Sequence, residues 1–138
     1  MTVSEIGKII AQGEGVSVEF KEAREKVPAS FYETVVSFAN TNGGAILLGV
    51  DDDCNVTGVN PEKKATLLKN IATALNSNDN INPVLYLNPT AIDYDGKVVI
   101  AIQRVFCSVG LGGRNWVGNP KHKEIPAVLC RKCKACFY

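Results

Sequence analysis

Apolar residues recur at helical spacing in three stretches of the chain. The first follows Thr2, which has the spacing of a capping box with Glu5 and places Ile6, Ile9 and Ile10 on one face. The second runs from Ser30 to Asn42, after Pro28, and the third from Pro61 to about Leu75. The pattern therefore predicts three helices, each with one apolar face.

Extended segments alternate with these helices. Residues 16–21 alternate apolar and polar positions, which predicts a half-buried strand, and the almost wholly apolar residues 45–50 predict a central strand covered on both faces. A turn at Asp51 to Asn55 precedes a short return strand at residues 56–59. Residues 84–94 and 98–105 flank Asp95-Gly96, which predicts a hairpin.

This order of elements predicts an α+β domain, a mixed β-sheet with about three flanking helices. We assign residues 1–105 to the domain and residues 106–138 to an irregular basic tail, because Gly and Pro leave that tail little periodicity. In the run from Asn40 to Gly44, glycines follow a helix and precede a strand. The run lacks the Lys-Ser/Thr of a phosphate-binding loop, so a structural use is favoured over phosphate binding.

Length and composition restrict the class of protein. The 138 residues suffice for one domain, and 46% hydrophobic with 21% charged residues is ordinary for a globular protein. Glu5 and Lys8 interrupt any signal peptide at the start, and no apolar run could span a bilayer. We therefore expect a cytoplasmic protein without a membrane partner. The five cysteines, odd in number and clustered at one end, make a poor disulfide framework.

Charge is unevenly distributed along the chain. From Arg104 onward there are seven basic residues and one acid, a net charge of +6, whereas the preceding part has eight basic and thirteen acidic residues, a net of −5. A basic end suits a polyphosphate partner through counterion release. The alternative is a solvated surface segment.

Three acidic residues could converge if the first two strands lie together: Glu14, Glu19 and Asp52. Mg²⁺ or Mn²⁺ prefers oxygen ligands, and metal-assisted phosphodiester hydrolysis uses such a cluster. Lys21, two residues from Glu19 on the same strand face, could contact a phosphate or stabilise developing charge. The alternative is that these acids are ordinary surface charges.

The tail holds a second possible metal site. Cys130, Cys133 and Cys136 are each separated by two residues, with Cys107 and His122 upstream. Thiolates at such spacing can hold Zn²⁺ or an iron–sulfur cluster, but no second Cys pair completes a zinc ribbon. Free thiols are therefore favoured over Zn²⁺. His122 is the only histidine, which disfavours a catalytic Ser/His or Cys/His pair.

Three blocks together resemble the Schlafen AlbA-type domain family. They are Glu14 to Lys21 (EGVSVEFK), Val36 to Gly44 (VSFANTNGG) and Leu48 to Asp52 (LGVDD). Their order and spacing are those of the family, and the resemblance covers about residues 3 to 104. After the last hairpin strand, the chain lacks the Tyr-Val-Arg-Val-Gly-like strand with which family members usually continue.

The resemblance implies an α+β DNA-binding domain of bacterial transcriptional regulators and RecG-like helicase-related proteins. It also implies that related domains cleave tRNA or rRNA with two glutamates and an aspartate. The matching positions here are Glu14, Glu19 and Asp52, with Asp51 as an alternative. The chain has no ATPase motif.

Three hypotheses follow. The first is a nucleic-acid-binding domain for DNA or structured RNA, in which Lys21, Arg24, Lys26 and Arg104 contact phosphates. The second is a Mg²⁺- or Mn²⁺-dependent endoribonuclease that uses Glu14, Glu19 and Asp52 as metal ligands. The third is a protein-interaction domain, such as a homodimer, that associates through an uncovered sheet edge.

Overall fold

The computed structural model describes residues 1–41, 43–76, 81–82, 87–105 and 129–130. Its helices are α1 (Val3–Gln12), α2 (Ser30–Ala39) and α3 (Lys64–Leu75), with a 3-10 turn, η1 (Pro61–Lys63), directly before α3. Its strands are β1 (Val18–Lys21), β2 (Gly44–Leu48), β3 (Ile81–Asn82), β4 (Thr90–Tyr94), β5 (Lys97–Val105) and β6 (Leu129–Cys130). The expected α+β architecture is confirmed.

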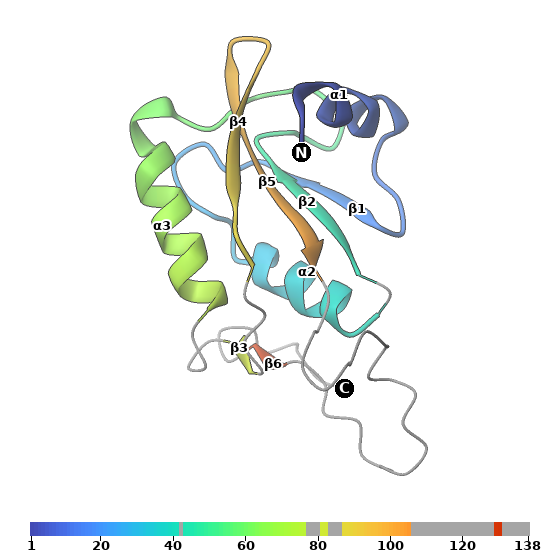
Figure 1. The fold of residues 1–138 in the computed structure, drawn as a ribbon, viewed down its shortest axis with the longest axis vertical. Helices are drawn as coiled ribbons and strands as arrows, with labels where there is room; N and C mark the ends of the chain where they lie inside the picture. The colour runs from blue at the N-terminus through green and yellow to red at the C-terminus, as the bar shows by residue number, and fades with distance from the viewer. Residues whose placement is uncertain (42, 77–80, 83–86, 106–128, 131–138) are drawn as a thin grey trace.

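Four strands form a mixed sheet in the order β1-β2-β5-β4 (Figure 1). β1 is parallel to β2, whereas β5 is antiparallel to both β2 and β4. The apolar β2 is thus a central strand, as its sequence predicted. A separate pair, β3 and β6, is antiparallel.

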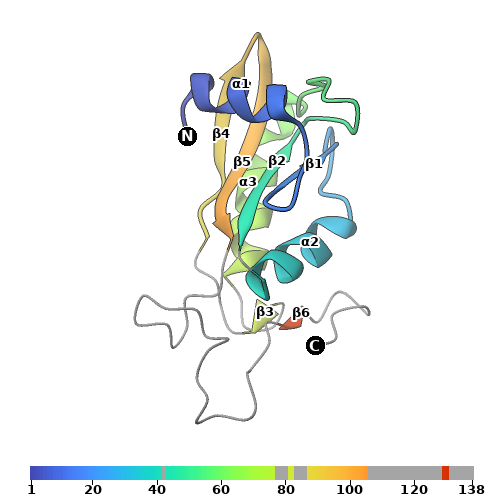
Figure 2. The ribbon, with the colours of Figure 1, turned by 90° about the vertical axis from the view of Figure 1, so that its right-hand side faces the viewer.

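The sheet lies between helices (Figure 2), with α1 in front of the strands and α3 behind them. On the α1 face, Ile6 packs with Phe20, Leu47 and Val99. On the opposite face, α2 and α3 supply one large cluster against β2 and β5, which includes the buried residues Phe31, Val35, Phe38, Leu67, Ile71, Leu75, Ile46, Leu48, Ile100 and Ile102. Alternate residues of β2 and β5 therefore supply two cores, and this burial on both faces is the main stabilising term.

The ends of the elements show which local signals decided the fold. The capping box at α1 is confirmed, since Thr2 accepts from the Glu5 backbone N–H and the Glu5 carboxylate accepts from that of Thr2. The Asp95-Gly96 hairpin is confirmed too, with φ of 52° and 79° at its two turn residues, as a tight two-residue turn requires. The glycines that follow α2 turn sharply and pack closely, since Gly43 has a φ of 84°.

Several predicted boundaries were wrong. The first strand begins at Val18 rather than Val16, because Gly15 pairs with Val18 in a tight turn that leaves Val16 93% exposed. The second helix ends at Ala39, where the Gly43 backbone N–H bonds back to the Phe38 carbonyl.

The return segment is not a continuous strand. Val56 bridges Val50 and Val59 bridges Val98 as isolated pairs, because Gly58, at a φ of 78°, bends the chain between them. The first arm of the hairpin begins at Thr90 in the structure, and residues 83–86 lie outside the described part.

The structure tests few of the predictions made for the tail. Within residues 106–138 only β6 is described, and Cys107, His122, Cys133 and Cys136 lie outside the described residues. The assignment of residues 106–138 as an irregular tail and the tail metal site therefore stay predictions. Among the described residues, no helix has both the length and the apolar character needed to cross a bilayer.

Candidate functional site

Glu14 lies at the free edge of β1. Its carboxylate Oε1 accepts a hydrogen bond of 2.7 Å from the backbone N–H of Phe20. The carbonyls of Ser17 and Lys21 accept hydrogen bonds from the backbone N–H groups of Ala45 and Gly49, so the backbone groups of odd-numbered residues here face β2. The backbone N–H of the even-numbered Phe20 therefore points away from β2. Glu14 and the Gly15–Val18 turn together occupy backbone groups that an edge strand would otherwise offer to another chain.

Glu19 and Lys21 share the face of β1 that α2 covers. Lys21 donates through Nζ to the hydroxyl of Ser30, at the start of α2, over 3.1 Å, and lies 3.5 Å from Glu19 Oε1. Only 12% of the Lys21 side chain is exposed, against 36% for Glu19. The strand-face pairing expected from the sequence is therefore present, and the Lys21 ammonium is already engaged by groups of this chain.

Asp51 and Asp52 follow β2 in an exposed turn. Asp51 Oδ1 accepts from the backbone N–H groups of Asp53 and Asn55 at 2.9 and 2.8 Å. These bonds, that from Asn55 foremost, hold the pKa of Asp51 below its usual value. Asp51 thus closes the turn, and the neighbouring Asp52 side chain is exposed.

The three predicted metal ligands do not form a ready-made site. Glu14 is bound to the Phe20 backbone, Glu19 faces Lys21, and Asp52 lies in the loop beyond the end of β2. In the described part of the chain, no three His, Cys, Asp or Glu side chains gather closely enough to hold a metal ion. This donor set does not fit Mg²⁺ or Mn²⁺ as it stands, and we derive no metal-dependent step from it.

Hydrogen bonds join the connection between β1 and α2 to the segment that precedes α3. The Asn60 backbone N–H donates to the Arg24 carbonyl over 2.8 Å, and the Asn60 side-chain amide donates to both Glu25 carboxylate oxygens at 3.0 and 3.3 Å. Arg24 in turn donates to the Thr57 carbonyl at 3.4 Å. Residues 21–26 and residues 62–69 are therefore held as one surface, which we call the basic surface.

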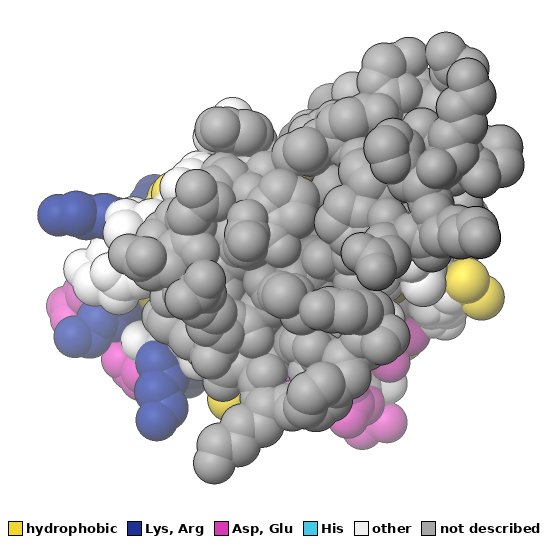
Figure 3. Space-filling model, turned by 90° about the horizontal axis from the view of Figure 1, so that it is seen from below, with side chains coloured by type: hydrophobic (Ala, Val, Ile, Leu, Met, Phe, Trp, Pro, Cys, Tyr) yellow, Lys and Arg dark blue, Asp and Glu magenta, His cyan; other side chains and the backbone are white. Residues whose placement is uncertain are grey.

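Charge separates sharply between this basic surface and the rest of the described residues. Residues 21–26 and 62–69 carry six Lys or Arg and three Glu side chains, a net charge of +3. The other described side chains include two lysines, Lys8 and Lys97, and nine acids, a net of −7. From below (Figure 3), basic side chains gather along the margin on the side where Figure 1 draws α3, mixed with acidic ones.

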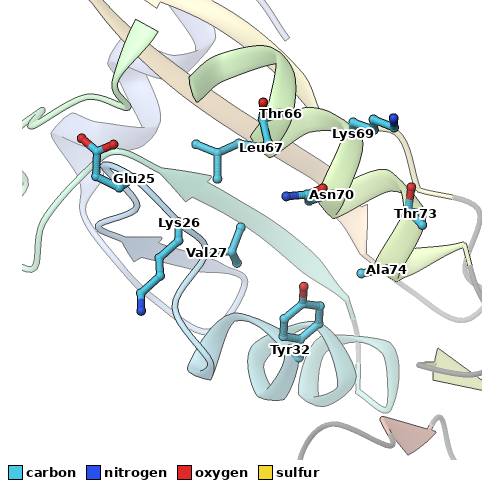
Figure 4. A pocket seen from close by; sticks show the side chains of 10 residues that line it. All are labelled: Glu25, Lys26, Val27, Tyr32, Thr66, Leu67, Lys69, Asn70, Thr73 and Ala74. Carbon is cyan, nitrogen blue, oxygen red and sulfur yellow. The ribbon is translucent and has the colours of Figure 1, made fainter. Parts of the chain in front are cut away.

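A cavity of about 520 Å³ opens within the basic surface. Its apolar lining consists of Val27, Leu67 and Ala74, of which Leu67 and Ala74 are buried. The rest of its lining is polar or charged and comes from the β1–α2 connection, from α2 and from α3: Glu25, Lys26, Tyr32, Thr66, Lys69, Asn70 and Thr73 (Figure 4). A volume of this size is in the usual range for a small-molecule or ligand-group site.

Sequence reasoning found part of this surface and missed the rest. Lys21, Arg24 and Lys26 were predicted and belong to it, Lys21 with its ammonium engaged by Glu19 and Ser30. Arg104 belongs to β5, and its side chain lies outside the described part. Lys63, Lys64 and Lys69 were missed. The signal for Lys69 was present in the helical spacing, since Thr66, Lys69, Asn70 and Thr73 recur at intervals of three and four residues, opposite the apolar positions of α3.

A solved structure shares this fold. The solution NMR structure of the N-terminal domain of a RecG-related protein from Nitrosomonas europaea matches with a TM-score of 0.57 at 22% identity, over 75% of this chain and 72% of that one. The crystal structure of the DIP2311 protein from Corynebacterium diphtheriae matches with a TM-score of 0.47 at 21% identity, over 74% of this chain and 24% of that one. No curated protein sequence matches the chain.

A family model settles the affiliation. The model described as Schlafen, AlbA_2 matches residues 14–109, which is more than half of the chain. The matched range contains all three sequence blocks, the four-stranded sheet, α2 and α3. The chain therefore belongs to the Schlafen AlbA_2 family.

Proposed function

We propose that this chain is a nucleic-acid-binding domain whose contact surface is the basic surface formed by residues 21–26 and 62–69. The observation that carries the proposal is the separation of charge, +3 on this surface against −7 on the other described residues. A phosphate backbone is attracted to one side of such a molecule and repelled from the other, so the charge both binds and orients it.

The position of Lys63 and Lys64 supports a role in binding. Both lie at the start of α3, where the helix macrodipole disfavours positive charge, and the first turn of α3 has no acidic residue. Glu62 in the preceding turn offsets part of this cost. Because the two lysines do not help the helix, phosphate contact is a better account of their placement than stability.

The family and one structural neighbour support this class of partner. The resemblance implies a DNA-binding role in transcription control, and one structural neighbour is described as RecG-related. We propose DNA binding as the finer function for this chain. A cytoplasmic location and a homodimer stay predictions.

Hydrolysis is not part of the proposal, because the Glu14 and Glu19 carboxylates are engaged within the chain. Loss of these charges should therefore leave binding intact. Glu14→Gln keeps an acceptor for the Phe20 N–H, and Glu19→Gln removes a negative charge 3.5 Å from the Lys21 ammonium. We expect both variants to bind nucleic acid as well as the natural chain or better.

The test incubates the purified chain, Glu14→Gln and Glu19→Gln with labelled tRNA and with duplex DNA, each in Mn²⁺ and in EDTA. Mobility shifts of intact nucleic acid that are equal in Mn²⁺ and EDTA, and shared by all three proteins, are expected. Cleavage that needs Mn²⁺ and disappears in Glu19→Gln would instead establish the endoribonuclease. The absence of any shift at low salt would leave the interaction domain as the better hypothesis.

A further inference from the structure

The cavity lies between the two segments of the basic surface, not beside them. Lys26 and Val27 come from the β1–α2 connection, and Thr66, Lys69, Asn70 and Thr73 come from α3. A nucleic-acid strand that ran along the basic surface from one segment to the other would therefore pass over the mouth of the cavity.

The walls of the cavity have the chemistry that recognises a nucleobase. Tyr32 on α2 supplies an aromatic ring, and Asn70 on α3 supplies an amide that both donates and accepts. In Figure 4 the Asn70 amide and the Tyr32 hydroxyl are directed toward the space between the connection and α3. Unpaired bases are bound by stacking on aromatic rings and by hydrogen bonds to their edges.

The charges are at the rim and suit a phosphodiester on each side of that base. Lys26 and Lys69 project from opposite sides of the cavity (Figure 4), and neither has an ion-pair partner among the described residues. The carboxylate of Glu25, the one acid of the lining, accepts two bonds from the Asn60 amide. The lining contains no glycine, so it lacks the backbone cradle that a free nucleoside triphosphate uses.

We propose that this cavity receives one unpaired base of a nucleic-acid strand, with its flanking phosphates on Lys26 and Lys69. The inference rests on the proposed function and deepens it, because it makes single-stranded segments, rather than closed duplex, the preferred ligand. A base inside a duplex is stacked and paired on both sides and could enter only after it is extruded.

The test measures fluorescence anisotropy of the full chain with three labelled probes of equal length: a mixed-sequence single strand, the same strand with its central bases removed as abasic sites, and the closed duplex. Stacking of one base is worth about 1–3 kcal/mol, or roughly fivefold and more in affinity. We therefore expect at least fivefold weaker binding of the abasic strand than of the intact single strand.

Substitutions of cavity residues test whether the preference for the single strand arises in the cavity. Tyr32→Leu and Asn70→Ala should each weaken the single strand about fivefold or more while leaving the duplex within about twofold, because only the single strand presents a base. Tyr32→Phe keeps the ring and should retain at least half of the affinity. Since Tyr32 packs against the core, a thermal melt of each variant confirms that it is folded. Lys69→Gln should weaken every probe, and Lys8→Gln on α1 is the matched charge control.

The outcomes separate the two proposals. A duplex bound as tightly as the single strand, with no effect of the abasic sites, Tyr32→Leu or Asn70→Ala, would overturn the base site and leave the basic surface standing. No binding of any probe at low salt would overturn both. Loss of affinity in Tyr32→Phe equal to that in Tyr32→Leu would also contradict stacking as the mode of binding.

Discussion

At the scale of single residues, Asp51 gives a prediction about pH. Its carboxylate accepts from two backbone N–H groups and from the Asn55 amide, and its pKa is lowered in the folded state. The charged form therefore stabilises the fold fully at pH values above the ordinary carboxyl pKa of 3.8, and this contribution is lost as the pH falls through the lowered value.

Asp51→Asn should accordingly be less stable than the natural chain at neutral pH. The difference in the free energy of unfolding should shrink as the pH falls below the ordinary carboxyl pKa. Urea unfolding at a series of pH values measures this. Asp52→Asn removes the same charge at the exposed neighbouring position and is the matched control. A difference for Asp51→Asn that stays constant across the acid range would contradict the prediction.

Residue patterns located the acids in the sequence but not their partners. The spacing correctly predicted that Glu19 and Lys21 share a strand face, because strand side chains alternate. It could not predict that Glu14 turns back onto the Phe20 backbone, because that bond depends on the tight turn at Gly15. The sequence thus predicts which face a side chain occupies better than it predicts which group the side chain contacts.

At the scale of elements, Gly44 stands at the start of β2, where there is no room for a side chain. An added Cβ would lie 2.7 Å from the Ser17 carbonyl oxygen and 2.9 Å from the Phe38 ring. The carbonyl cannot retreat without cost, because it accepts the Ala45 N–H at 2.9 Å in the β1–β2 pairing. Gly44→Ala should therefore lower the free energy of unfolding by about 1–3 kcal/mol.

Gly15→Ala is the control for this prediction, since nothing lies within 4 Å of an added Cβ there. It should change the free energy of unfolding by less than about 0.5 kcal/mol, or raise it slightly, because alanine lowers the conformational entropy of the unfolded chain. Chemical denaturation of both variants measures the contrast. Equal stability of the two variants would show that the contact at Gly44 relaxes easily.

Elements were predicted well where one periodicity ran without interruption. The apolar faces of α2 and α3 and the central β2 were foreseen because their burial repeats along the sequence. The return segment after β2 was predicted as a strand from Val56 and Val59, but each makes only an isolated bridge. Its conformation is set by Gly58 and by pairing with residues 50 and 98, contacts that no local pattern contains.

At the scale of the whole molecule, folding creates a charge pattern that the linear sequence hides. The sequence showed a basic end after Arg104 and an acidic remainder. In the structure, hydrogen bonds from Asn60 to Arg24 and Glu25 bring residues 21–26 beside residues 62–69. Most of the basic side chains that precede Arg104 are thereby gathered on one surface. This part of the site could not be predicted, because the side chain and backbone of one asparagine, Asn60, join it to residues 35 and 36 positions earlier in the chain.

The basic surface predicts how salt should act on binding. The logarithm of the affinity for duplex DNA falls linearly with the logarithm of salt concentration, and each lysine that contacts a phosphate contributes about one unit of slope. Lys63→Gln with Lys64→Gln should therefore reduce the slope by about two units. The same double variant should be as stable as the natural chain or slightly more so, because it removes positive charge from the start of α3.

Anisotropy titrations with labelled duplex across a range of salt, together with a thermal melt, measure both effects. Lys8→Gln is the control, since Lys8 is an exposed lysine on α1 and so lies on the opposite side of the sheet from α3. Its slope should match that of the natural chain. A slope reduced equally by Lys8→Gln would mean that net charge alone attracts DNA. A double variant with lower stability and an unchanged slope would mean that these lysines serve the fold instead.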